Sequence, residues 1–134
     1  MADDGKVLID SSVWIDFLNG RDDVVAAVTL LIRSGRVVVC GQVLQEVLQG
    51  SRDDKAFTKL EGQMAAWPAE IEEPADFVEA ARLFARLRWR GVTVPPTDCL
   101  MAAVAIRRKL LLYANDVDFD AIPGVIRYRP SAAP

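Results

Sequence analysis

Four acidic residues stand at positions where their carboxylates could take part in chemistry: Asp10, Glu46, Asp98 and Asp116. Four carboxylates brought together without compensation would repel one another, and some would have to take up protons. One or two divalent cations would resolve that conflict, and Mg²⁺ and Mn²⁺ prefer oxygen ligands of this kind. Such a site can activate a water molecule and stabilise the charge that develops on a phosphodiester during hydrolysis.

The amino-acid composition excludes several other catalytic mechanisms. The sequence contains no histidine, which excludes Ser-His-Asp triads, histidine acid–base pairs and histidine-ligated metals. Cys40 and Cys99 are the two cysteines, and each lies in an apolar segment without the spacing of a zinc site. We therefore expect buried free thiols, and chemistry based on carboxylates.

Each acid also has a purely structural explanation. Asp10 and Asp98 could cap the helices that follow them, because aspartate is favoured at helix N-termini. Asp116 could serve as a turn residue, and Glu46 could be a solvated residue on a helix. No acid taken alone therefore establishes a site.

The sequence pattern predicts an α/β fold that would position these acids. Short β-branched or apolar runs predict strands at 6–10, 36–40, 69–73, 110–114 and 125–128. Amphipathic or apolar segments between them predict helices at about 11–19, 22–34, 42–49, 53–67, 74–90 and 99–108. This alternation indicates a mostly parallel central sheet of about four to five strands, with helices on both faces.

Ligands of open α/β sheets gather beyond the carboxyl ends of the strands. Asp10 ends the first predicted strand and Asp116 follows the fourth, so both belong to that rim. Asp98 begins a nearly continuous apolar helix, which would hold its carboxylate on a rigid element. Glu46 lies at the boundary of the apolar stripe of its helix, from which it could reach over the rim.

Length and charge limit the remaining possibilities. A chain of 134 residues has room for one domain, and we expect a single domain over 1–134 with a flexible tail from about 130 to 134. No apolar run is long enough to span a membrane and the start does not resemble a signal peptide, so we expect a cytoplasmic protein. The net charge of −3 means that binding of nucleic acid would need a local basic patch or a bound cation.

Two groups of basic residues stand out, and both have structural explanations. Arg82, Arg86 and Arg90 recur at intervals of four and are typical of a solvated helix face. The cluster at 107–109 lies at a helix C-terminus, where positive charge interacts favourably with the helix dipole. We therefore assign no RNA site to the cluster at 107–109 and favour a solvated helix face for Arg82, Arg86 and Arg90, with contact to RNA phosphate as the alternative.

Three longer segments carry a family resemblance: LIDSSVWIDFL near the start, QVLQEVLQG in the middle, and PPTDCLMAAVAIRRKLLLYANDVDF near the end. In order and separation they resemble the VapC group of PIN-domain toxins. The resemblance implies an Mg²⁺- or Mn²⁺-dependent endoribonuclease that hydrolyses RNA with metal-activated water. It also implies neutralisation by a cognate VapB-type antitoxin and assembly as a homodimer or a larger toxin–antitoxin complex.

The resemblance assigns roles to individual acids. The first acid of the family matches Asp10, its helical glutamate matches Glu46, and its third acid matches Asp98. The fourth acid matches Asp116, with Asp118 as an auxiliary candidate in the same loop. Three of these residues, Asp10, Asp98 and Asp116, are expected to bind the metal, and Glu46 is expected to bind it directly or through water.

Two hydroxyl residues are further auxiliary candidates. Ser12 matches a position two residues after the first acid of the family, where a hydroxyl helps to hold the metal site. Helix capping explains Ser12 equally well, and it is the favoured explanation for Thr97, which precedes Asp98.

Two other functions remain open at this point. A receiver-like signalling domain would also present Mg²⁺-binding acids at the rim of a small α/β sheet. It would need a phosphoacceptor aspartate after a central strand and a lysine after a later one, and neither fits the strands at 69–73 and 110–114. The second alternative is a catalytically inactive PIN scaffold that acts only as a binding partner.

Overall fold

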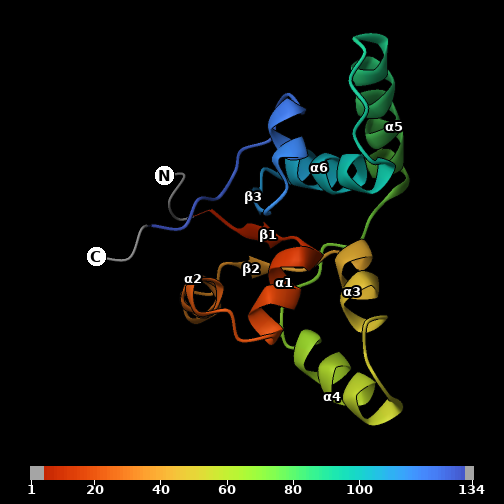
Figure 1. Cartoon of the computed structure of the whole chain (residues 1–134). Coiled ribbons are helices and arrows are strands. Elements are labelled where there is room, and N and C mark those ends of the chain that lie inside the picture. Colours follow the sequence, from red (N-terminus) through yellow and green to blue (C-terminus); the bar gives the residue numbers. More distant parts are fainter. Residues whose placement is uncertain (1–4, 132–134) are drawn as a thin grey trace.

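The computed structural model describes residues 5–131, which form a small parallel sheet surrounded by helices (Figure 1). The strands are β1 (Val7–Ile9), β2 (Val37–Val38) and β3 (Leu111–Tyr113). The helices are α1 (Ser11–Leu18), α2 (Asp22–Arg33), α3 (Gly41–Leu48), α4 (Asp54–Met64), α5 (Pro74–Trp89) and α6 (Pro96–Arg108), and a 3-10 helix, η2, spans Val117–Ala121. The predicted α/β architecture is confirmed.

The strand order is β2-β1-β3, with both pairs parallel. Val7 of the central strand pairs with Val37 on one side and Leu111 on the other. All three residues of β1 are fully buried, as expected for a parallel strand covered on both faces. β2 lies on one side of β1 and β3 on the other, so the strand order reverses at β1, and its carboxyl end is the point where ligands of such sheets gather.

The predicted count of four to five strands was too high, because the segments at 69–73 and 125–128 do not form strands. Each makes a single parallel bridge, Val39 with Ala69 and Leu112 with Arg127. The first segment is bounded by Pro68 and Pro74, which lack the N–H group that a strand ladder needs. The second is followed closely by Pro130, and its one bridge is to β3.

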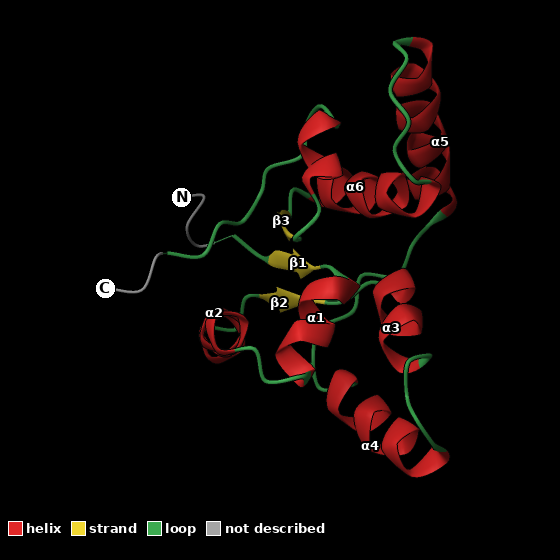
Figure 2. Ribbon diagram, in the orientation of Figure 1, coloured by secondary structure: helices red, strands yellow, loops and turns green. Residues whose placement is uncertain are grey.

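The helices take the positions that their apolar faces predict. Six residues of α6 are buried in the core: Cys99, Met101, Ala102, Ala103, Val104 and Ala105. This helix begins three residues earlier than expected, at Pro96, because proline is tolerated in the first helical turn. In the view of Figure 1, α5 and α6 lie above the sheet and α3 and α4 below it, with the end of β1 between them; Figure 2 marks the same elements by type.

The prediction for the two cysteines is confirmed. Cys40 and Cys99 are buried and unbridged. Burial raises the pKa of the Cys40 thiol to about 12, so that this group stays protonated. Within residues 5–131, no helix is long and apolar enough to cross a membrane.

A buried ion pair joins the beginning of α5 to the end of α6. Asp76 is fully buried, and its carboxylate accepts hydrogen bonds from Arg108 Nη1 at 2.7 Å and Nη2 at 2.9 Å. Arg107 donates a third at 2.7 Å, and the Glu73 N–H a fourth at 2.6 Å. Burial alone would raise the pKa of Asp76, but these donors outweigh it and hold the pKa well below its usual range. The predicted basic cluster at 107–109 thus has a structural role.

A second long-range contact fixes the beginning of α3. The N-cap residue is Cys40, which is not a favoured capping residue. The Glu72 carboxylate takes over this function: it accepts hydrogen bonds from the N–H groups of Gly41 at 2.7 Å and Gln42 at 2.8 Å. A Cβ atom at Gly41 would lie 2.8 Å from Glu72 Oε1, so glycine leaves room for the cap. Glu72, in a segment predicted as a strand, therefore holds the helix that carries Glu46.

We predict that Asp76→Asn lowers the free energy of unfolding by about 3 to 5 kcal/mol, because Arg108 would lose its buried counter-charge. Urea denaturation measures the change. The matched control is Glu79→Gln, which breaks a pair with Arg82 that has much more access to water and should cost less than about 1 kcal/mol. Equal effects of the two variants would contradict the structural role of Asp76.

The pairing of Asp76 also has a defined pH dependence. Its pKa in the folded state is below the ordinary value of 3.8, so its contribution to stability is fully present at and above about pH 5. The contribution is lost as the pH falls below 3.8 toward the folded-state pKa. Between pH 5 and pH 3, Asp76→Asn should therefore lose less stability than the unmodified chain.

We predict that Glu72→Ala lowers the free energy of unfolding by about 0.5 to 2 kcal/mol, the usual range for a lost helix cap. It should also accelerate amide hydrogen exchange at Gly41 and Gln42, which NMR resolves residue by residue. Glu61→Ala, which removes an exposed glutamate from α4, is the control and should leave both amides unchanged. Unchanged exchange in Glu72→Ala would show that this carboxylate does not cap α3.

Candidate metal centre

Asp10 lies immediately after β1, and its main chain is held from two sides. Its N–H donates to the Tyr113 carbonyl at 2.8 Å, and its own carbonyl accepts from the N–H groups of Val13 and Trp14 at 3.1 Å. Asp10 occupies the N-cap position of α1, yet within the described residues its side chain caps no backbone group. The carboxylate instead accepts a 2.7 Å hydrogen bond from Ser12 Oγ. The capping explanation of Asp10 therefore fails, and the structure brings Ser12 to the site.

Asp98 is the third residue of α6 and is partly buried. Its pKa is raised to about 6, first by burial and then by the charges of four other carboxylates. In order of decreasing effect these are Asp10, Asp116, Asp118 and Glu46. The acids chosen from the sequence, which lie far apart along the chain, thus form one electrostatic cluster around Asp98.

Asp116 and Asp118 follow β3 and complete the cluster. One carboxylate oxygen from each of Asp98, Asp116 and Asp118 can be chosen so that all three lie within 4.8 Å of one another. Asp116 also caps η2, because its Oδ1 accepts from the Asp118 N–H at 2.8 Å. The structural and the functional explanations of Asp116 are therefore compatible. Asp118 thus lies within the same 4.8 Å limit of Asp98 as Asp116 does.

Glu46 extends from α3 toward the same acids. Its pKa is raised by burial and by the charge of Asp10, while the side chains of Gln42 and Ser11 act in the opposite direction. Its Oε1 atom is buried and has no hydrogen-bond partner among the described residues. A buried carboxylate oxygen without a partner is costly, so this atom is suited to a cation or an ordered water.

The donors gathered here fit a hard divalent cation. Each candidate ligand is a carboxylate oxygen, and three of them are already close enough to share one ion. Mg²⁺ and Mn²⁺ select such oxygen donors, and Mg²⁺ usually keeps several waters beside a few carboxylates. A cation would also remove the repulsion that raises the pKa of Asp98.

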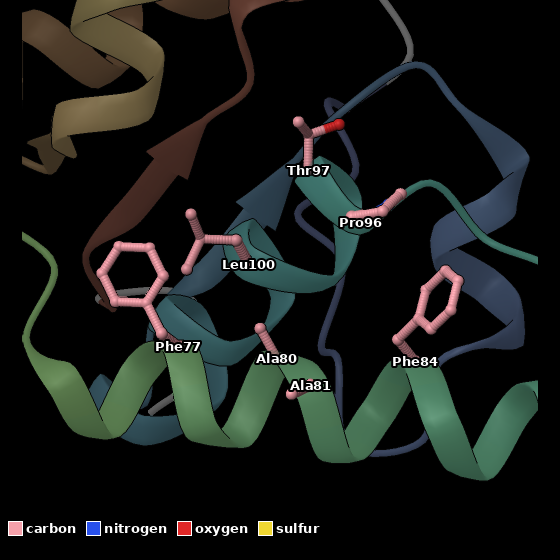
Figure 3. Close-up of a pocket in the computed structure, with 7 residues that line it drawn as sticks. All are labelled: Phe77, Ala80, Ala81, Phe84, Pro96, Thr97 and Leu100. Atoms are coloured by element: carbon pink, nitrogen blue, oxygen red, sulfur yellow. The ribbon is translucent and has the colours of Figure 1, made fainter.

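Thr97 does not have the helix-capping role that the sequence predicts. The N-cap of α6 is Pro95, and over residues 5–131 no side chain caps this helix, so the predicted capping role of Thr97 is wrong. Thr97 is exposed and lines an apolar cavity of about 450 Å³ between α5 and α6, opposite Phe77 and Phe84 (Figure 3). This cavity is a different environment from the acidic cluster.

The sequence does not predict a contact near the site between Asn115 and Asp16. The Asn115 side-chain amide donates to Asp16 Oδ2 at 3.1 Å, which ties the loop before Asp116 to α1. The two residues are 99 positions apart, so no local pattern could have shown their contact. The Asn-Asp pair at the end of a predicted strand was the one available signal.

Comparison with known proteins places the chain in a family. The profile of the PIN domain matches residues 7–125. Ribonuclease VapC11 from Mycobacterium tuberculosis is 32% identical over 121 residues, which cover 87% of this chain and 90% of that protein.

Solved structures show the same fold at lower identity. VapBC2 from Rickettsia felis, bound to a DNA fragment from its promoter, has a TM-score of 0.78 at 20% identity, covering 91% of this chain and 96% of that chain. DNA-bound VapBC from Salmonella typhimurium has a TM-score of 0.79 at 19% identity, covering 92% and 97%. The profile match and the VapC11 alignment each span most of the chain, and the protein therefore belongs to the PIN-domain family, in its VapC group.

Proposed function

We propose that this protein is an endoribonuclease that hydrolyses RNA phosphodiester bonds with the help of bound Mg²⁺ or Mn²⁺. The observation that carries the proposal is the convergence of Asp98, Asp116 and Asp118 within 4.8 Å, beside two further acids that raise the pKa of Asp98. The relative VapC11 is named a ribonuclease, which agrees with this chemistry. Membership of the PIN family argues against the receiver-like alternative.

The metal ligands in this proposal are Asp10, Asp98 and Asp116, with Glu46 bound directly or through water and Asp118 as an auxiliary ligand. When bound, the cation lowers the pKa of a water molecule and neutralises charge on the reacting phosphate. Ser12 holds the Asp10 carboxylate in one orientation through its 2.7 Å hydrogen bond.

Glu46 has a second task in this proposal. Its buried Oε1 lacks a partner among residues 5–131 and is free to accept a hydrogen bond from the attacking water. The cap provided by Glu72 keeps α3, and with it Glu46, directed toward Asp10. The backbone contacts of Asp10 with Tyr113 keep β1 and β3 in register beneath the cluster.

We further propose that a VapB-type antitoxin neutralises the protein, in a homodimer or a larger complex. The solved neighbours from R. felis and S. typhimurium are VapBC pairs. A surface suited to a protein partner lies between α1, α2 and α4, where an apolar cavity of about 350 Å³ is lined by Trp14, Phe17, Leu60, Met64 and Trp67, among others. Apolar openings of this kind on a protein surface commonly mark interaction sites.

The proposal predicts RNA cleavage that requires Mg²⁺ or Mn²⁺ and that EDTA abolishes. Asp10→Asn and Asp98→Asn should each reduce kcat/KM at least about 100-fold, because loss of even an indirect metal contact typically costs 10- to 100-fold. Glu61→Gln on α4 is the matched control and should retain activity. Circular dichroism establishes that each variant is folded. Folded Asp variants with undiminished cleavage would refute the ligand assignment, and a folded, metal-loaded protein without cleavage would indicate an inactive scaffold.

Ser12→Ala tests the support of the metal centre separately. Loss of its hydrogen bond should weaken Mn²⁺ binding about 10-fold or more, as measured by isothermal titration calorimetry, with little effect on thermal stability. Thr58→Ala, which removes a hydroxyl from the exposed face of α4, should leave Mn²⁺ affinity unchanged. If both variants bind Mn²⁺ as the unmodified chain does, Ser12 does not position Asp10.

A further inference from the structure

Three arginines from two distant parts of the sequence surround one cavity beside the acidic cluster. Arg21 comes from the loop between α1 and α2, and Arg127 and Arg129 come from the segment after η2. The cavity has a volume of about 440 Å³, within the usual range for small-molecule sites. The basic runs that the sequence made conspicuous lie elsewhere, with Arg107 and Arg108 bound to Asp76.

Polar and aromatic groups line this cavity together. Asn115 contributes its amide, which is held in place by the hydrogen bond to Asp16. Tyr113 and Tyr128 form part of the wall, with ring centroids 5.2 Å apart and planes inclined by 48°. Single-stranded RNA is recognised by such combinations, in which bases stack on aromatic or guanidinium planes and their edges form hydrogen bonds.

The charges around the cavity favour a neutral ligand over a phosphate. Arg21 forms two ion pairs: its Nη1 lies 3.2 Å from Asp16 Oδ2, and its Nε lies 3.3 Å from Asp23 Oδ1. Asp120 Oδ1 lies 2.8 Å from Arg127 Nη1 and 3.5 Å from Arg129 Nη2.

Three guanidinium groups are therefore matched by three carboxylates, and no excess positive charge remains to attract an anion. The same groups offer both hydrogen-bond donors and acceptors, which is what the edge of a nucleobase requires. Arg21 and Arg129 keep 61% and 71% of their side chains exposed, so their surface ion pairs are weak and can rearrange around a ligand.

The position of the cavity links it to the proposed reaction. Asn115 and Val117 line it, while Asp116 between them contributes to the acidic cluster. Asp116 has extended backbone angles, φ −74° and ψ 129°, and in an extended chain successive side chains point to opposite sides. The cavity and the acids are therefore separated by little more than the width of one backbone segment.

The geometry points to a base-binding pocket for a nucleotide next to the scissile phosphate, formed chiefly by Asn115, Arg129 and Tyr128. This inference rests on the proposed ribonuclease function and adds to it a determinant of sequence preference. Asn115 contacts the edge of the base, and the exposed guanidinium of Arg129 covers its face. The RNA strand thus passes from the acids to this pocket over the loop that holds Asp116.

Cleavage of short single-stranded RNAs that differ in one nucleotide beside the cleavage site tests the pocket. The unmodified chain should prefer one base, measured as the ratio of kcat/KM between the best and the worst substrate. Asn115→Ala should reduce that ratio about 10-fold, the effect expected from loss of one specific base contact. Arg86→Ala, an exposed arginine on α5, is the control and should leave both the ratio and the activity unchanged.

Equal losses on all substrates, with the ratio retained, would overturn the base-binding role and indicate a general contact with the RNA backbone. A binding measurement keeps the pocket testable without cleavage: RNA hexanucleotides are added to the Asp98→Asn variant, and the side-chain amide signals of Asn115 are followed by NMR. These signals should shift, and their assignment is checked by their loss in Asn115→Ala. Unshifted signals would overturn the pocket, whereas shifted signals without cleavage by the unmodified chain would count against the nuclease proposal alone.

Discussion

Repulsion between carboxylates at the carboxyl end of β1 is the constraint on which the rest of the structure depends. Asp98 is surrounded by four other acids, and burial together with their charges raises its pKa to about 6. Such a cluster persists only if rigid elements hold each member in place. The backbone contacts of Asp10, the buried helix α6 and the capped helix α3 provide that rigidity.

Acids inside and outside the cluster are treated differently by the fold. Asp76 is deeply buried but receives hydrogen bonds from two arginines, and Glu72 is paired with the N–H groups at the beginning of α3. Glu46 Oε1, by contrast, is buried without a partner among the described residues. Asp76 and Glu72 therefore have their hydrogen-bond donors supplied by the chain itself, whereas the proposed metal centre would take its counter-charge from a bound cation. This difference separates a site from an accidental gathering of acids.

The sequence predicted those features that depend on local patterns. Asp10 at the end of a buried strand and Asp98 at the beginning of an apolar helix were found where expected. Features that depend on distant contacts were missed: Glu72 caps a helix about 30 positions away, which no strand pattern could indicate. In the sequence Thr97 resembled a helix N-cap, but α6 begins one residue earlier, at Pro96, with Pro95 as its N-cap. The arginines that meet beside Asn115 come from two distant segments of the sequence, so only the fold reveals their cavity.

The most direct test of the metal centre is the anomalous diffraction of a crystal soaked in Mn²⁺. A peak is predicted in contact with carboxylate oxygens of Asp98 and Asp116, at roughly 2.0 to 2.2 Å, the distance usual for small divalent cations bound to oxygen. Asp10 should bind the same ion, directly or through an ordered water, and Glu46 Oε1 should face it or one of its waters. Absence of a peak at Asp98 at millimolar Mn²⁺, or a peak at acids outside the cluster, would contradict the account.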